Sequence, residues 1–151
     1  MAAKLLIVDD EESVRAALRR TLRRSSHELL FARDADDALG LLDRERVDVV
    51  VSDHLMPGMT GVELLRAVRA RWPYAGRVML TGHADLDTAM EAIRSGDIDR
   101  FLMKPWDDVE LRVALDLVCE KVALEAESRR LLAALREQGE ACRAGGDGER
   151  A

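Results

Sequence analysis

Short apolar runs and segments with helical spacing alternate along the chain. Apolar runs lie at residues 5–8, 29–32, 47–51, 78–80 and 101–103, and segments with a helical apolar period follow them at 13–24, 35–44, 62–71, 86–94 and from about Asp108 onward. Runs such as 5–8 are continuously apolar, as in strands that are covered on both faces. The strict alternation of strand and helix predicts an α/β fold with a five-stranded, doubly wound parallel sheet and right-handed crossovers.

The last predicted helix is longer than the sheet requires. Residues 109–138 would span about 45 Å at 1.5 Å per residue, whereas covering one strand layer needs about half of that length. The first half carries an apolar stripe that can pack on the sheet, formed by Leu111, Leu115, Val118 and Val122. The second half carries a weaker heptad-like seam of Leu124, Leu131 and Leu135.

This pattern divides the chain into three parts. Residues 1–122 form the main domain, 123–141 a helical extension that is a candidate coiled coil, and 142–151 a glycine-rich segment expected to be a flexible tail. The extension either associates with a partner or stays a solvated helix held by charge pairs such as Glu127 with Arg130.

Composition narrows the class of protein. The 151 residues, 48% of them hydrophobic and 34% charged, suit one folded domain with an appended element. The net charge of −6 argues against direct binding to nucleic acid, because such domains usually carry a basic surface. We find no apolar run of about 20 residues and no signal peptide, and expect a cytoplasmic protein without membrane contact. Cys119 and Cys142 lie outside any metal-binding spacing and are expected to be packing residues.

Polar residues that can take part in a reaction or bind a ligand follow four of the strands. Asp9 and Asp10 follow the first strand, Asp53 the third, Thr81 the fourth and Lys104 the fifth. Each alone is compatible with helix capping or turn formation. In a doubly wound sheet, however, all of these strand ends meet at one edge, and the first and third strands lie side by side. We therefore expect the three carboxylates to lie within several ångströms of one another.

Such a group of carboxylates needs a counter-charge. Two like charges 4 Å apart repel by about 4 kcal/mol at an effective dielectric constant near 20. A divalent cation is the expected counter-charge. Because the site offers few protein oxygens and would leave water on the ion, Mg²⁺ fits better than Ca²⁺. Together with the Lys104 ammonium and the Thr81 hydroxyl, this set is typical of a phosphoryl-transfer site. Asp53 is the predicted nucleophile, because it stands alone at its strand end while the adjacent pair Asp9 and Asp10 suits the metal.

Four segments resemble the receiver domain of two-component response regulators, the CheY-like family. They are Ile7-Val8-Asp9-Asp10, Asp53 to Gly61, Val78 to Gly82 and Phe101 to Pro105, in the family's order and at its spacing. The resemblance covers about residues 4–120. It implies a flavodoxin-like (βα)5 fold with strand order 2-1-3-4-5, here followed by an extended C-terminal helix.

The resemblance implies roles for the acidic residues. Asp53 would accept a phosphoryl group from a histidine kinase or a phosphotransfer protein. Asp10 would bind Mg²⁺ directly and Asp9 largely through water, and the backbone carbonyl of Leu55 would complete the protein ligands. The chain would then act as a regulator rather than as an enzyme.

The resemblance also implies a switch. Thr81 and Lys104 would contact phosphate oxygens, and the Lys104-Pro105 bond would be cis. Thr81 would move toward the phosphate, and Phe101 would rotate into the space that it leaves. The altered face comprises the fourth helix, the fifth strand and the fifth helix, and it would control an output module, a partner protein or a homodimer that also uses the helical extension.

The output remains open at this point. The Lys104-Pro105-Trp106 variant and the segment 96–100 before it are similar to receivers of hydrogenase-type transcriptional regulators or of cyclic-di-nucleotide phosphodiesterases. Two other functions compete with a phosphorylated receiver. A phosphatase with Asp53 as nucleophile would need a second aspartate two residues later, where this chain has Leu55, and a receiver-like scaffold would not need the complete set of site residues. His54 and His83 are interpreted as ordinary loop histidines.

Overall fold

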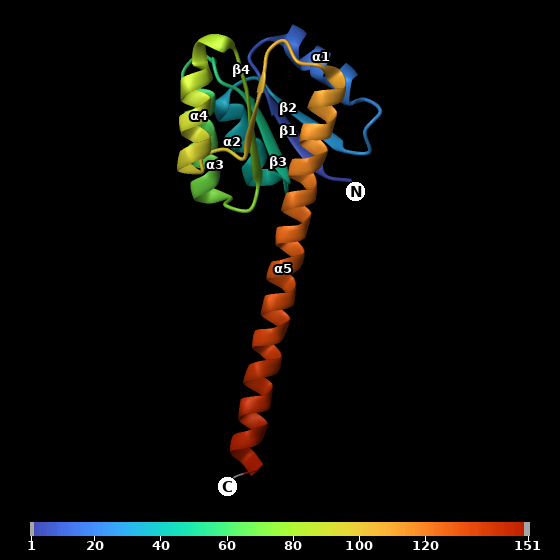
Figure 1. Ribbon diagram of the computed structural model, residues 1–151, viewed down its shortest axis with the longest axis vertical. Coiled ribbons are helices and arrows are strands. Elements are labelled where there is room, and N and C mark those ends of the chain that lie inside the picture. Colours follow the sequence, from blue (N-terminus) through green and yellow to red (C-terminus); the bar gives the residue numbers. More distant parts are fainter. Residues whose placement is uncertain (1, 150–151) are drawn as a thin grey trace.

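The computed structural model describes residues 2–149, with side chains through residue 141, and contains one parallel sheet. The strands are β1 (Lys4–Val8), β2 (Glu28–Ala32), β3 (Val49–Asp53), β4 (Gly76–Thr81) and β5 (Arg100–Met103). Their order is β2-β1-β3-β4-β5 (Figure 1). The predicted α/β class and the flavodoxin-like strand order are confirmed.

Five α-helices and one short 3-10 helix connect the strands. They are α1 (Glu12–Leu22), α2 (Ala35–Arg44), α3 (Gly61–Arg71), η1 (His83–Asp85), α4 (Leu86–Ser95) and α5 (Asp108–Glu149). Side chains of α2, α3 and α4 pack on one face of the sheet, and those of α1 and α5 on the other. The residues of β1 from Leu5 onward and all residues of β3 are buried, which explains why these strands have continuous apolar runs rather than alternation.

The register of β1 against β3 sets the position of the carboxylates. Val8 pairs with Ser52, so the next residues, Asp9 and Asp53, emerge side by side from the carboxyl edge of the sheet. Asp53 itself pairs with Leu80 of β4, one residue before Thr81. The predicted third strand, 47–51, is therefore shifted in the structure to Val49–Asp53, and the phosphoacceptor candidate is the last residue of the strand.

Helix α5 leaves the domain and continues as a single helix (Figure 1). At 1.5 Å per residue it is about 63 Å long. Its first turns bury Leu111, Leu115 and Val118 against the sheet, whereas Leu124 and Leu131 on the extension are 63% and 57% exposed. Among residues 2–149, no helix combines the length and the apolarity that a membrane span requires.

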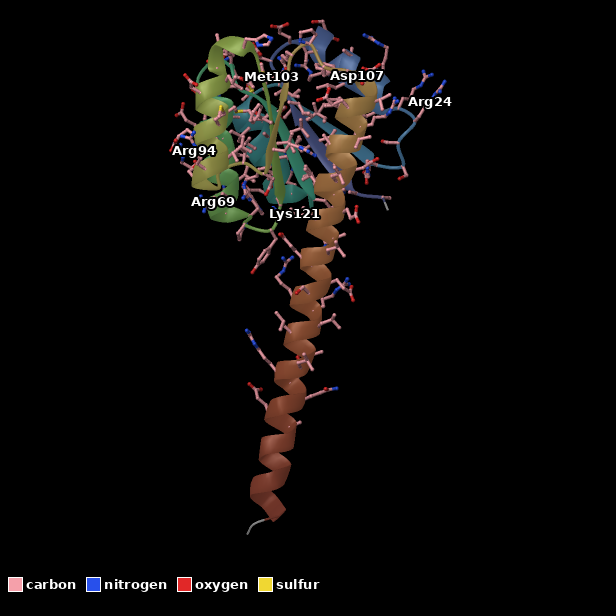
Figure 2. The ribbon with its side chains drawn as sticks, in the orientation of Figure 1. Arg24, Arg69, Arg94, Met103, Asp107 and Lys121 are labelled. Atoms are coloured by element: carbon pink, nitrogen blue, oxygen red, sulfur yellow. The ribbon has the colours of Figure 1, made fainter. Side chains whose placement is uncertain are left out.

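Two contacts hold the start of the extension against the domain. The Lys121 ammonium lies 2.8 Å from an Asp99 carboxylate oxygen. The Arg129 guanidinium lies over the Tyr74 ring, 3.6 Å from its centroid. Figure 2 shows Lys121 where the helix emerges from the domain. The Tyr74 turn between α3 and β4 thereby supports the helix beyond the edge of the sheet.

The end of α5 differs from the sequence prediction. The sequence predicts a helix that ends near Gln138, whereas the helix runs on to Glu149. The predicted flexible tail over 142–151 stays a prediction. Glycine lowers helix stability by only about 1 kcal/mol per residue, and the segment contains no proline to break the backbone hydrogen bonds. Residues 150 and 151 lie outside the described residues.

The start of α3 packs against the end of β3 without space for a side chain. A Cβ at Gly61 would collide with the Asp53 backbone carbonyl and would lie 2.8 Å from the His54 Cα. The Gly61 N–H donates to the His54 carbonyl at 2.8 Å, and the Thr60 and Glu63 side chains cap the helix just beyond. Because these neighbours are backbone atoms, they cannot move aside as a flexible side chain can.

We therefore expect Gly61→Ala to lower the free energy of unfolding by about 3 kcal/mol through overpacking. The matched control is Gly40→Ala inside α2, where a Cβ would meet no atom within 4 Å. That change should instead raise the free energy of unfolding by about 0.5–1 kcal/mol, since alanine is the better helix former. Urea unfolding of the two variants measures both values, and similar values for them would contradict the packing argument.

Candidate functional site

Four strand ends deliver the predicted site residues to one edge of the sheet. Asp9 and Asp10 follow β1, Asp53 ends β3, Thr81 ends β4 and Lys104 follows β5. Figure 2 labels Met103 and Asp107, which flank the Lys104 segment at the upper end of the domain, opposite the end from which α5 emerges.

The three aspartates converge as expected. Carboxylate oxygens of Asp9, Asp10 and Asp53 all lie within 4.8 Å of one another. Asp9 and Asp53 are buried, while Asp10 is exposed and leaves one side of the cluster open to solvent. Hard oxygen donors around an open side form a donor set that suits a small divalent cation with retained water.

Backbone contacts fix Asp9 in place. Its N–H donates to the Ala32 carbonyl of the neighbouring strand at 3.1 Å, and its Oδ1 accepts from the Glu11 N–H at 2.9 Å. The Arg15 guanidinium donates to the Asp9 carbonyl at 2.6 Å. One carboxylate oxygen of Asp9 is thus committed to the start of α1, and the other faces the cluster.

Lys104 connects the two buried aspartates. Its ammonium lies 2.9 Å from Asp53 Oδ1 and 3.4 Å from Asp9 Oδ2. Its backbone N–H donates to the Thr81 carbonyl at 2.8 Å, so the lysine is held in register with β4. The Lys104-Pro105 bond is cis, as expected. The lysine supplies one positive charge among the three carboxylates.

The electrostatics of the site are dominated by burial. Burial raises the pKa of the Asp9 carboxyl above its ordinary value, and the negative charge of Asp53 raises it further, although the Glu11 N–H and Lys104 oppose the shift. Burial lowers the pKa of Lys104, but its bonds to Asp53 and Asp9 outweigh this effect and the pKa lies above its ordinary value. Lys104 therefore stays charged in the folded protein, and burial of the ionised Asp9 carboxylate costs free energy.

Thr81 and Phe101, the predicted switch pair, lie on the neighbouring strands β4 and β5. Thr81 is only 1% exposed, and its hydroxyl donates a long 3.3 Å bond to the Gly82 carbonyl. Phe101 pairs with Met79 across β4 and β5 and lines a hollow of about 220 Å³ between β5 and the start of α5. The hydroxyl is weakly bonded, and the Phe101 side chain packs against the core cluster on the α2, α3 and α4 face of the sheet.

Two residues near the site add to the sequence interpretation. His54 lies in the loop directly after the phosphoacceptor candidate, as the sequence indicates, and its side chain is buried, with the residue only 8% exposed. His83 is exposed. Arg15 was not anticipated, and only its spacing of six residues after Asp9, one turn into α1, could have indicated its contact.

Other features of the chain lie away from this cluster. A groove of about 1500 Å³ runs between α5 and the Tyr74 turn at the opposite end of the sheet, and none of the predicted site residues line it. Cys119 is buried as predicted, and burial raises the pKa of its thiol to about 11, so it is a poor nucleophile. The side chain of Cys142 lies outside the described residues.

Comparison with known proteins agrees with this geometry. Residues 5–116 match the family model described as the response regulator receiver domain. The chain is 40% identical over 145 residues to the response regulator protein FleR of Pseudomonas aeruginosa, which covers 87% of this chain and 30% of that protein. It is 37% identical over 129 residues to the hydrogenase transcriptional regulatory protein HoxA of Cupriavidus necator, covering 85% and 27%. This chain thus spans less than a third of either relative.

A solved structure shows the same architecture. The signal receiver domain of an HD domain-containing protein from Pseudomonas fluorescens Pf-5 superposes with a TM-score of 0.78 at 40% identity, over 83% of this chain and 92% of that one. Sequence, strand order and the arrangement of the strand ends lead to one assignment. The chain belongs to the receiver domain family of two-component response regulators.

Proposed function

We propose that this receiver is phosphorylated on Asp53 by a histidine kinase or a phosphotransfer protein in a Mg²⁺-dependent reaction. The observation that carries the proposal is the Lys104 ammonium lying between Asp53 and Asp9 inside a cluster of three carboxylates. A structural ion pair would need one carboxylate, whereas this site holds three negative charges against one positive charge. The remaining charge favours a divalent cation.

The donor set fits Mg²⁺. Asp10 is exposed and offers a direct carboxylate ligand, and Asp9 is committed through one oxygen to the Glu11 N–H, which suits a contact through water. Asp53 and the backbone carbonyl of Leu55, two residues later, would complete the protein ligands. When bound, the ion would neutralise charge on the phosphoryl oxygens and orient them.

The side chains of the site would perform the transfer as follows. An Asp53 carboxylate oxygen attacks the phosphorus of the donor, the bond from phosphorus to the donor nitrogen or oxygen breaks, and the leaving group takes the electron pair. Lys104 is already 2.9 Å from Asp53 and would then pair with a phosphoryl oxygen. The Thr81 hydroxyl would donate to another phosphoryl oxygen. Phe101 would respond to the movement of Thr81.

The proposed output is control of another module or protein through the α4-β5-α5 face and the helical extension. FleR is named as a response regulator and HoxA as a transcriptional regulatory protein, and both are much longer than this chain. We therefore propose a transcriptional output that is carried by another module rather than by direct contact of this domain with nucleic acid. The division into a receiver at 1–122 and a helical extension at 123–141 is part of this proposal.

Incubation with Mg²⁺ and a small acyl phosphate should add one phosphoryl group to the wild-type protein. Asp53→Asn should abolish the addition, because an amide oxygen is a poor nucleophile. Asp87→Asn, at an exposed carboxylate on α4, is the matched control and should be modified like the wild type. Intact-protein mass spectrometry measures the addition. Equal modification of the Asp53 variant would place the phosphoacceptor elsewhere.

Asp9→Asn should raise the free energy of unfolding by about 1 kcal/mol at neutral pH without Mg²⁺, because it removes a buried charge with a raised pKa. The raised pKa means that the folded protein binds this proton more tightly than the unfolded chain. In the wild type, the loss of stability caused by this buried charge is therefore absent below the ordinary pKa of 3.8. It develops as the pH rises through the folded-state pKa.

Magnesium supplies the second measurement for the same variant. Millimolar Mg²⁺ should raise the melting temperature of the wild type, since it binds a site that exists only in the folded chain. The increment should be much smaller in Asp9→Asn. An unchanged melting temperature of the wild type with Mg²⁺ would contradict the metal assignment.

The exposed seam should support self-association of the phosphorylated or beryllofluoride-treated protein. Leu124 and Leu131 are seven residues apart on one side of α5, and both are more than half exposed. Leu131→Glu should weaken dimerisation in sedimentation analysis. Ala133→Glu is the matched control, because it lies nine residues or about two and a half turns from Leu124, on the opposite side of the helix. Equal effects of the two changes would exclude the seam as the interface.

A further inference from the structure

His54 is a buried titratable side chain that the proposed reaction does not use. Among the side chains of residues 2–141, its Nδ1 is the one buried nitrogen or oxygen without a hydrogen-bond partner. Its Nε2 lies 4.0 Å from Asp85 Oδ1, which is too long for a hydrogen bond. Neither ring nitrogen is bonded, although a buried polar group without a partner costs free energy.

The imidazole stands on a rigid support. The His54 N–H donates to the Leu80 carbonyl at 3.0 Å, and its carbonyl accepts from the Gly61 N–H at 2.8 Å. The backbone of His54 is therefore fixed between β4 and the start of α3, directly after the phosphoacceptor Asp53. With this backbone fixed, the distance to Asp85 changes through movement of Asp85 or through rotation of the imidazole.

Asp85 lies on a segment that can move. It ends η1, a single 3-10 turn without a buried side chain, and its N–H makes a long 3.2 Å bond to the Gly82 carbonyl. Its side chain is 22% exposed. The segment from Gly82 to Asp85 is joined directly to Thr81 at the end of β4, so displacement of Thr81 is transmitted to Asp85.

Phosphorylation supplies a direction for that displacement. The Thr81 hydroxyl now makes only a 3.3 Å bond to the next residue's carbonyl, and a charged phosphoryl oxygen on Asp53 is a stronger acceptor. Asp53 is on β3, and the residue after it is His54. Movement of Thr81 toward the phosphoryl group therefore draws the η1 segment toward the strand end that carries the imidazole.

We propose that His54 is a positioning residue that holds the β4–α4 segment in the phosphorylated state through a hydrogen bond from Nε2 to the Asp85 carboxylate. The inference rests on the proposed function. Closing the gap from 4.0 Å to the length of a hydrogen bond needs a displacement of only about 1 Å. The bond places the imidazole proton on Nε2 and fixes the segment that positions Thr81 against the phosphate.

A double-mutant cycle with beryllofluoride and Mg²⁺ tests this bond in the full chain. We expect His54→Ala and Asp85→Ala each to weaken the apparent affinity for beryllofluoride about tenfold, which corresponds to about 1.4 kcal/mol. The double variant should be no weaker than either single variant. His54→Gln, which keeps a donor near the Nε2 position, should restore most of the affinity. Asp87→Ala on the exposed side of α4 is the control and should bind like the wild type.

Two further measurements separate positioning from a general structural role. Urea unfolding without beryllofluoride should show no coupling between His54 and Asp85, since the two side chains are not bonded in that state. The ¹⁵N resonances of the His54 ring should change on addition of beryllofluoride in the wild type and not in Asp85→Ala. His54→Gln and Asp85→Ala keep the test valid if His54→Ala does not fold.

The outcomes that overturn the inference are distinct from failure of the proposed function. Additive effects, equal coupling with and without beryllofluoride, or a His54→Gln variant as weak as His54→Ala would each overturn the His54–Asp85 bond alone. A wild-type protein that binds no beryllofluoride would overturn the proposed function and this inference with it.

Discussion

Repulsion between carboxylates at the edge of a parallel sheet is the constraint on which the rest of this domain depends. The pairing of Val8 with Ser52 makes Asp9 and Asp53 leave the sheet side by side, whatever the loops beyond them do. Burying two negative charges whose carboxylate oxygens lie within 4.8 Å of each other costs free energy, and Lys104 compensates only part of this cost. The domain thus carries a local excess of negative charge that makes its stability sensitive to any cation or charged group added there.

The same topology gives the site rigid and movable parts. Asp53 ends the central strand, His54 follows it, and both are held by the backbone at the start of α3, where even one methyl group at Gly61 has no room. Thr81 and the η1 segment sit on the neighbouring strand end, with long hydrogen bonds and no buried side chain in the turn. A charge added beside the rigid part is therefore expected to change the position of the movable part, and by linkage the position of the movable part changes the free energy of adding that charge.

The α/β class and the acidic cluster could be predicted from apolar periodicity and from the residues at the strand ends, and the strand order from the resemblance to receiver domains. The ion pairs that Arg66 and Arg69 form with the buried Asp97 could not be predicted from the sequence. Burial raises the pKa of Asp97, but Ser95, Arg66 and Arg69 outweigh this and lower it, and the partners lie up to 31 residues away. The burial of His54 could not be predicted either, because tertiary packing decides it rather than local spacing.

The extension of α5 adds a mechanical consequence. A Cβ at Gly76 would lie 2.7 Å from a Val118 methyl group, so the absence of a side chain there lets α5 pack tightly on the start of β4. Leu117, Leu124 and Leu131 follow one another at intervals of seven residues and are all exposed, so one seam runs from the domain onto the projecting helix. A partner that covers this seam contacts the helix packed on β4 and β5 and the extension together. The packed turns and the seam belong to one helix, so a change in how α5 packs on the sheet would alter the surface that this partner meets along the whole seam.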